Sequence, residues 1–289
     1  MTSQQRSPVV DAEKPKKSSR AGRDLPAAIA VGVVLGGMAI GTLLFAPLWW
    51  LPLLAVAIAI ATHEVIRRLR EHGFVLPTVP LLVGGQAMIW LTWPFGAAGL
   101  LGAYAGTVVI CMFWRLLGQG LNKQPINYLR DIAASVLLAT WVPLFAAFTA
   151  LLIFADDGGE RVFTVIATVV FADIGGYVAG VLFGRHLMAP AISPKKSWEG
   201  MGGSLVFGTA AAILSVAFLL DRPAWIGVPL GVLLVITGVL GDLVESQVKR
   251  DLGIKDMGTL LPGHGGIMDR IDAMLPSAVV GWIVLTLLA

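Results

Sequence analysis

Long apolar runs alternate with short polar stretches along almost the whole chain. Nine runs can be separated, and several are close to the lower limit of about 17 residues for a helix that crosses a bilayer core. A segment in lipid must satisfy its own backbone hydrogen bonds, so each run is expected to form a helix. The pattern predicts an all-α polytopic integral membrane protein with about nine transmembrane helices. The predicted spans are 25–45, 48–62, 78–93, 97–115, 132–154, 162–183, 202–220, 224–241 and 273–289.

The third run has a second interpretation. It contains Gly84, Gly85 and Gln86 and ends at Trp93, a composition that weakens it as a lipid-facing helix. The second and third runs are therefore also compatible with a shorter hairpin buried inside the protein.

The first 24 residues are polar and basic, and they lack the apolar side chains that would offset the entropy of ordering. They are predicted to be a disordered cytoplasmic tail, followed by one membrane-embedded domain over 25–289. A cleaved signal peptide is the alternative. The apolar run from Leu25 to Phe45 is too long for the core of such a peptide.

Composition restricts the class of protein. Of the 289 residues, 56% are apolar and 13% are charged, and the mean hydropathy is +0.81. A soluble domain carries about 25% charged residues. One water-soluble core cannot bury so much apolar surface, so the bilayer is the expected environment. The single cysteine, Cys111, excludes an intrachain disulfide.

The basic residues are placed unevenly. With the N-terminus inside the cell, the cytoplasmic stretches and Arg115 hold 19 of the 21 Lys and Arg residues, and Arg161 and Arg222 are the two outside. This asymmetry is the positive-inside bias. It predicts a multi-pass cell-membrane protein whose N-terminus and polar loops face the cytoplasm. The cytoplasmic stretches are 1–24, 63–77, 116–131, 184–201 and 242–272.

The longest polar connection, from Gly241 to Asp272, contains six acidic and four basic residues and His264 in 32 positions. If the eighth span continues as a helix, Asp242, Glu245 and Lys249 lie on one face of it, together with Ser246. Pairing of Glu245 with Lys249 at a solvated helix end is the simpler interpretation.

Asp269 and Asp272 form a second pair of carboxylates just before the last span. Hard divalent cations prefer oxygen ligands, and Mg²⁺ is commonly held by one or two carboxylates and substrate phosphates. Asp242 and Asp269 would bracket such a cation if the two helix ends meet. The alternative is that Asp269 and Asp272 cap the ninth helix.

Asp173 lies near the middle of the sixth span, where a charge costs about 2.5–3.5 kcal/mol on insertion scales. It is therefore expected to face a hydrated cavity or a pairing partner, and we favour the cavity. Gly176, Gly180 and Gly184 follow on one face of the same helix, where they favour close packing of a second helix.

The long polar loop carries a recognisable motif. It resembles the signature of the phosphatidate cytidylyltransferases, also called CDP-diacylglycerol synthases. The upstream stretch Ser193-Pro194-Lys195-Lys196-Ser197-Trp198-Glu199-Gly200 is similar to a second motif of that family. The signature matches over 27 residues, as Ser246-x-Val248-Lys249-Arg250-x4-Lys255-Asp256-x-Gly258-x2-Leu261-Pro262-x-His264-Gly265-Gly266-Ile267-x-Asp269-Arg270-Ile271-Asp272.

The resemblance implies transfer of a cytidylyl group from CTP to phosphatidic acid, with Mg²⁺ as cofactor and a second, monovalent or divalent cation left open. It also implies a homodimer and a site open to both cytosol and lipid. Nucleic acid is not an expected partner. Asp242 and Asp269 are the expected metal ligands. Catalytic roles are expected for Asp242, Asp269, Lys249, Arg250, His264 and Asp272. Substrate binding is expected for Ser193, Lys195, Lys196, Ser197, Lys255, Arg270, Gly265, Gly266 and, from its mid-span position, Asp173.

Two other functions stay open at this point. A related membrane transferase, such as a CDP-archaeol synthase or a polyprenol kinase, would use similar substrates. A transporter would use Asp173 for ion coupling. A transporter has no need for polar chemistry gathered at one face, so the enzyme is favoured.

Overall fold

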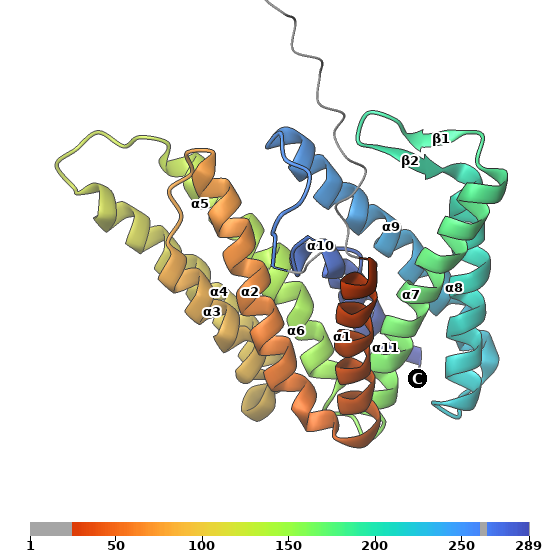
Figure 1. Cartoon of the computed structure of the whole chain (residues 1–289). Coiled ribbons are helices and arrows are strands. Elements are labelled where there is room, and N and C mark those ends of the chain that lie inside the picture. The colour runs from red at the N-terminus through yellow and green to blue at the C-terminus, as the bar shows by residue number, and fades with distance from the viewer. Residues whose placement is uncertain (1–24, 261–264, 289) are drawn as a thin grey trace, which may run out of the picture.

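The computed structural model describes residues 25–260 and 265–288. Figure 1 shows a bundle of helices that run up and down, with a small two-stranded hairpin at one end. The elements in chain order are α1 (Leu25–Phe45), a 3-10 turn (Pro47–Trp49), α2 (Trp50–Glu71), α3 (Thr78–Trp90), α4 (Thr92–Gln119), α5 (Tyr128–Ala139), a π-helical turn (Thr140–Leu144), α6 (Phe145–Leu152), α7 (Gly158–Phe183), β1 (Leu187–Ala189), β2 (Ser193–Ser197), α8 (Trp198–Phe218), a 3-10 turn (Ala224–Ile226), α9 (Gly227–Asp251), α10 (Met268–Ile271) and α11 (Met274–Leu288).

The expected all-α membrane architecture is confirmed, with the short hairpin of β1 and β2 as an addition to it. Among the described residues, seven helical segments are long and apolar enough to cross a membrane. The apolar part of α1, Gly32–Phe45, and helix α3 are shorter, at 10–17 residues each. Each of the nine expected spans corresponds to a helix, but the count of nine crossings stays a prediction.

Several helices extend beyond the predicted spans, and α2 and α9 do so by the most at one end. Helix α2 continues to Glu71, although residues 63–77 were expected to be a loop. Hydropathy locates where the apolar run ends, whereas the helix goes on with ion pairs between Glu71 and both Arg67 and Arg68 at helical spacing. The same extension carries α9 to Asp251. Helix α2 is long enough to cross a membrane, so the alternative of a short buried segment is wrong for the second run. For the third run it stays open, because α3 has only 13 residues.

Apolar surface faces both inward and outward in this bundle. Leu51, Ile58 and Leu234 are fully buried in the centre. In the most apolar 18-residue stretch of α7, and likewise of α8, only 28% of the residues are buried. Large apolar side chains such as Val181 and Phe218 are exposed on the outside. An outward apolar surface of this kind fits lipid as the surrounding solvent.

Close packing joins α7 to α8 through small residues. A Cβ on Gly175 would lie 2.6 Å from the backbone oxygen of Gly203, and a Cβ on Gly176 would lie 2.3 Å from Ser204 Oγ. The predicted packing role of the glycines on α7 is confirmed at Gly176. The α7–α8 pair also packs on α9, and the hairpin contacts α9 through Lys196 and through the backbone of Ile192.

The charge-rich connections gather at one end of the bundle. The hairpin, the end of α2 and the end of α9 all lie at the top in Figure 1. At the opposite end are the turn between α1 and α2 and the turn between α8 and α9. The fold therefore brings the two polar loops singled out in the sequence to the same side of the membrane region.

Candidate functional site

The upstream motif forms the hairpin and the start of α8. Strands β1 and β2 pair antiparallel, with Leu187 opposite Ser197. Ser197 caps α8, because its hydroxyl oxygen accepts a hydrogen bond from the amide of Gly200 at 3.1 Å. Glu199 holds the other end of the connection by accepting the amides of Arg185 and His186. The sequence Ser-Pro-Lys-Lys-Ser is thereby fixed above α7 and α9.

A cavity of about 320 Å³ lies under this hairpin. Its walls come from α7, the hairpin, the start of α8 and α9, so it joins segments that lie far apart in the sequence. The polar residues that line it are Asp173, Tyr177, Ser193, Lys195, Lys196, Ser197, Ser204 and Asp242. The structure thus places Asp173 on a cavity, as expected, together with four predicted substrate-binding residues.

Lys196 connects the hairpin to α9. Its ammonium nitrogen lies 2.6 Å from Asp242 Oδ2 and donates to the backbone oxygen of Val239 at 3.3 Å. The other oxygen of Asp242 accepts a hydrogen bond from the Ser246 hydroxyl at 3.2 Å. Asp242 keeps an exposed fraction of 37% for its side chain. This pair therefore lies at the edge of the cavity, within reach of a soluble ligand.

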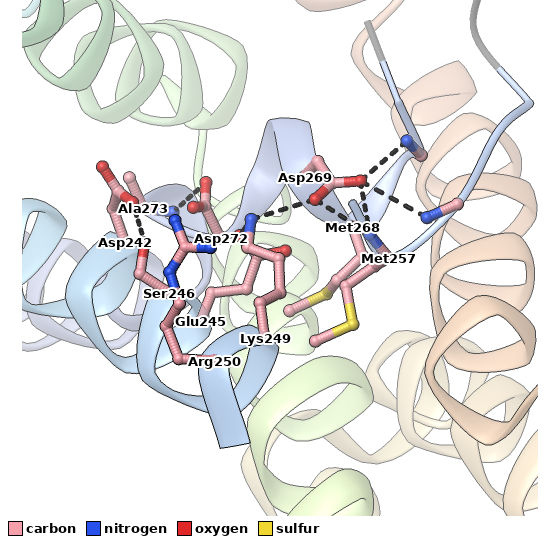
Figure 2. A network of polar contacts seen from close by, with 12 residues as sticks. Asp242, Glu245, Ser246, Lys249, Arg250, Met257, Met268, Asp269, Asp272 and Ala273 are labelled. Atoms are coloured by element: carbon pink, nitrogen blue, oxygen red, sulfur yellow. Dashed lines mark hydrogen bonds and ion pairs between the residues drawn. The ribbon is translucent and has the colours of Figure 1, made fainter. Parts of the chain in front are cut away.

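Asp269 organises the signature loop. Figure 2 shows its carboxylate surrounded by several hydrogen-bond donors. Oδ2 accepts the amides of Met257 at 3.0 Å, Gly258 at 3.4 Å and Gly266 at 2.8 Å. Oδ1 accepts from the Lys249 ammonium at 3.0 Å. The side chain is only 5% exposed. Charge-assisted bonds to backbone amides fix this carboxylate firmly in place.

Lys249 joins Asp269 to the acidic face of α9. Its ammonium also pairs with Glu245 Oε2, one helical turn earlier. Glu245 is fully buried, and its second oxygen, Oε1, has no hydrogen-bond partner in the part of the chain that the structure describes. Asp272 is buried nearby and accepts the amide of Ala273 at 2.8 Å. The predicted alignment of Asp242, Glu245 and Lys249 on one face of α9 is confirmed (Figure 2).

The two expected metal ligands do not share one point in this arrangement. Figure 2 shows Asp242 and Asp269 at opposite ends of the network, with Asp272 between them. Within residues 25–260 and 265–288, no group of three or more His, Cys, Asp or Glu side chains forms a ready metal cluster. The carboxylates are instead paired with Lys196 and Lys249, so their role as metal ligands stays a prediction.

The remaining predicted residues lie around these two groups. Arg250 is exposed and donates through Nε to the backbone oxygen of Ile192 at 3.2 Å, which ties α9 to the hairpin. Lys255 and Arg270 are exposed and do not line the cavity. Gly265 adopts a φ of +82°, a conformation that favours glycine. His264 lies outside the described residues.

Sequence reasoning missed Glu64 on α2. Its carboxylate accepts the amides of Ile267 at 3.2 Å and Met268 at 3.0 Å, just before Asp269. Beside it, Arg68 Nε donates to the backbone oxygen of Met257 at 2.9 Å. The available signal was a carboxylate directly after an apolar run, in a segment that was assigned to a loop.

Known proteins resemble this chain over almost its whole length. A model described as the cytidylyltransferase family matches residues 26–288. The chain belongs to the cytidylyltransferase family. Family members include a protein from Mycobacterium bovis named phosphatidate cytidylyltransferase, which is 58% identical over 280 residues and covers 94% of this chain and 92% of its own length. One from Mycobacterium leprae with the same name is 58% identical over 284 residues, covering 94% of this chain and 91% of its own length.

More distant members match a smaller part of the chain. A protein of the same name from Brucella suis is 38% identical over 242 residues, covering 70% of this chain and 89% of its own length. The family assignment confirms the resemblance that was read from the two loop motifs.

Proposed function

We propose that this chain transfers the cytidylyl group of CTP to phosphatidic acid, giving CDP-diacylglycerol and pyrophosphate. Its relatives carry the name of this activity. The observation that supports the proposal best is the ion pair of Lys196 with Asp242 at the edge of the cavity. It joins the upstream motif to α9, the helix on which the signature begins, at the polar end of a membrane bundle where a lipid and a nucleotide can meet.

The reaction needs little from the protein beyond placement and charge. A phosphate oxygen of phosphatidic acid attacks the α-phosphorus of CTP, and the bond to the β-phosphate breaks. The electron pair leaves with pyrophosphate. The nucleophile is already an anion, so no general base is required. Catalysis then consists of bringing two anions together, aligning them and stabilising the leaving group.

The cavity offers suitable groups for the nucleotide. Lys195 and Lys196 provide positive charge for phosphates, and the hydroxyls of Ser193 and Ser197 lie on the same walls. Lys255, Arg270 and the glycine pair Gly265 and Gly266 are proposed to contact substrate from the loop. Arg250, His264 and Asp272 keep their proposed catalytic roles.

Mg²⁺ is the proposed cofactor, with Asp242 and Asp269 as its ligands, and a second cation is left open. Carboxylate oxygens suit a hard cation, and Glu245 Oε1 is buried without a hydrogen-bond partner among the described residues. The described carboxylates do not form a group of three, so the two ligands would have to be joined through the bound substrate phosphates. When bound, Mg²⁺ would neutralise charge on the CTP phosphates and the leaving pyrophosphate. In the structure Lys196 and Lys249 balance these carboxylates.

The direct test uses purified protein with phosphatidic acid and CTP that is labelled on either the α- or the γ-phosphate. Cytidylyl transfer moves the α-label into lipid and leaves the γ-label in pyrophosphate. A CTP-dependent polyprenol kinase would move the γ-label into lipid instead. The assay is run with and without Mg²⁺, and loss of transfer without it is expected. Labelled lipid that carries only the γ-label would refute the proposal.

An archaeol-based lipid acceptor in place of phosphatidic acid distinguishes the other related transferase. A transporter is distinguished by ion flux in sealed vesicles that contain no CTP. We expect transfer to phosphatidic acid and no such flux.

Orientation and assembly are also proposals. The N-terminus and the site are proposed to face the cytoplasm of the cell membrane, and the enzyme is proposed to be a homodimer. Cysteines introduced at Ser18 and Asp157 should be labelled from opposite sides by an impermeant reagent. The natural Cys111 is buried, so its background should be low. Labelling from one side would contradict the orientation, and the mass of the detergent-solubilised protein tests the dimer.

A further inference from the structure

Glu64 is a buried carboxylate that faces the signature loop from α2. The residue is 8% exposed, and its two oxygens accept the amides of Ile267 and Met268. None of the ion pairs found between described residues involves it. Its hydrogen bonds therefore go to the backbone of the loop, and they fix the two residues before Asp269.

Two glycines of the signature pack directly on this carboxylate. A Cβ on Gly258 would lie 2.1 Å from Glu64 Oε1, and a Cβ on Gly266 would lie 2.4 Å from Oε2. These distances are far below any ordinary contact, so only glycine lets the backbone approach Glu64 this closely. The shape of the loop is thereby matched to a side chain on α2.

The same two glycines face Asp269 with their amides. Gly258 and Gly266 donate to Asp269 Oδ2, at 3.4 and 2.8 Å. The loop is therefore held between two carboxylates, with Glu64 against the glycine α-carbons and Asp269 on the amides. Arg68 adds a bond to the backbone oxygen of Met257, whose amide also donates to Asp269.

We propose that Glu64 is a positioning residue for Asp269. It fixes the described loop segments around Met257–Gly258 and Gly266–Met268, so that the Asp269 carboxylate and the Lys249 ammonium keep their relative placement. The inference rests on the proposed function, because it assumes that Asp269 acts in the reaction. The amides of Ile267 and Met268 each need an acceptor, and the Glu64 carboxylate offers one oxygen to each. A glutamine at this position would offer one oxygen and would turn an NH₂ group toward the second amide.

The first test measures loop order without any reaction. Amide hydrogen exchange is followed by mass spectrometry in peptides that cover 253–260 and 265–271, for the wild type and Glu64→Gln in detergent. We expect faster exchange of these peptides in the variant, with the peptides of α7 and α8 unchanged. Glu71→Gln is the control. It removes a carboxylate from an exposed position of the same helix, together with its ion pairs to Arg67 and Arg68.

The second test measures transfer. Removing a partner that orients a metal ligand typically costs about 10–100-fold in affinity or activity. We expect Glu64→Gln to lower kcat by about tenfold and to raise the Mg²⁺ concentration for half-maximal activity, with the KM for CTP changed less than about twofold. Glu64→Asp keeps both acceptor oxygens on a shorter side chain and should recover part of the loss. If Glu64→Gln fails to fold, Glu64→Asp takes its place in both tests.

The outcomes separate the two proposals. If the wild type transfers no cytidylyl group, the proposed function fails, while the exchange experiment still decides whether Glu64 orders the loop. Unchanged exchange with unchanged kcat in Glu64→Gln would overturn the positioning role. A lower melting temperature with normal kcat in the molecules that stay folded would overturn it as well, because Glu64 would then be purely structural.

Discussion

The cavity under the hairpin and the loop around Asp269 lie at the same end of α9, yet they hold their charged groups differently. At the cavity, Lys196 and Asp242 contact each other through side chains that are 23% and 37% exposed. In the loop, Asp269 is 5% exposed and is held mainly by backbone amides. An exposed ion pair contributes roughly 0–1 kcal/mol, so an incoming phosphate can replace Asp242 as the partner of Lys196. Asp269 cannot move unless the loop moves.

The comparison suggests a division of work between the two regions. The cavity can exchange its internal ion pair for contacts to a ligand, which suits binding. The loop keeps one carboxylate in a fixed place, which suits a group that must be aligned during the reaction. Substitutions in the two regions should therefore affect different kinetic constants.

The largest effect is expected at the fixed carboxylate. Asp269→Asn should lower kcat at least about 100-fold, roughly 2.7 kcal/mol of barrier, because the neutral amide loses the proposed metal ligand and the pair with Lys249. The protein should still be recovered from the membrane in folded form. Asp251→Asn, which removes an exposed carboxylate at the end of α9, is the control. Near-normal turnover by Asp269→Asn would exclude Asp269 from the reaction.

A smaller effect, on binding, is expected at the hairpin. Lys196→Gln should raise the KM for CTP by about 30-fold, or about 2 kcal/mol, since the side chain reaches the cavity edge and its loss also leaves Asp242 without its cation. Lys195→Gln should raise the KM for CTP only about threefold, because the charge of an exposed lysine is screened by water. Steady-state kinetics with varied CTP measures both. Equal effects would mean that the pairing with Asp242 has no bearing on binding.

A smaller effect on the rate is expected at Asp173, which lines the cavity from within the membrane-spanning part of α7. Asp173→Asn should lower the rate by about tenfold, or roughly 1.4 kcal/mol, with little change in melting temperature. A residue that only holds helices together would give a lower melting temperature and a normal rate per folded molecule. Both quantities are measured on one purified sample, and the second pattern would remove Asp173 from the site.

The smallest effect on turnover is expected beneath the cavity, where α7 packs on α8. Gly175→Ala puts a methyl group 2.6 Å from the backbone oxygen of Gly203, so the helices must shift, and a loss of about 1–3 kcal/mol of stability is expected. Gly180→Ala is the control, since its nearest neighbour would be Ser197 Oγ at 3.7 Å. Thermal melting in detergent compares them. Equal melting temperatures would show that the helix contact is loose.

Sequence patterns were sufficient for some of this arrangement and insufficient for the rest. Each of the nine apolar runs contains a helix, because a bilayer imposes length and composition directly. The spacing of Asp242, Glu245 and Lys249 predicted one helix face, since the period of a helix is fixed. The position of Asp173 predicted a cavity, because a charged side chain in the middle of a membrane span is costly unless it is hydrated or paired.

The remaining contacts could not be predicted in the same way. The pairing of Ser193–Ser197 with Leu187–Ala189 is local, but Ser-Pro-Lys-Lys-Ser lacks the apolar alternation that indicates a strand. The contact of Glu64 with Met268 joins residues 204 positions apart. The separation of Asp242 from Asp269 depends on how α9 and α10 are placed, which motif spacing does not encode.

The contact between α2 and the loop has a consequence for how the protein is made. Glu64 enters the membrane region early in synthesis, yet its partners Ile267 and Met268 emerge 203 and 204 residues later. At about 5–20 residues per second, a ribosome needs roughly 10–40 s to cover that interval. During this time the carboxylate has none of its final partners, so it must remain hydrated at the membrane surface. The loop can close on Glu64 only after Ile267 and Met268 have been made, which couples the assembly of the site to the synthesis of α10.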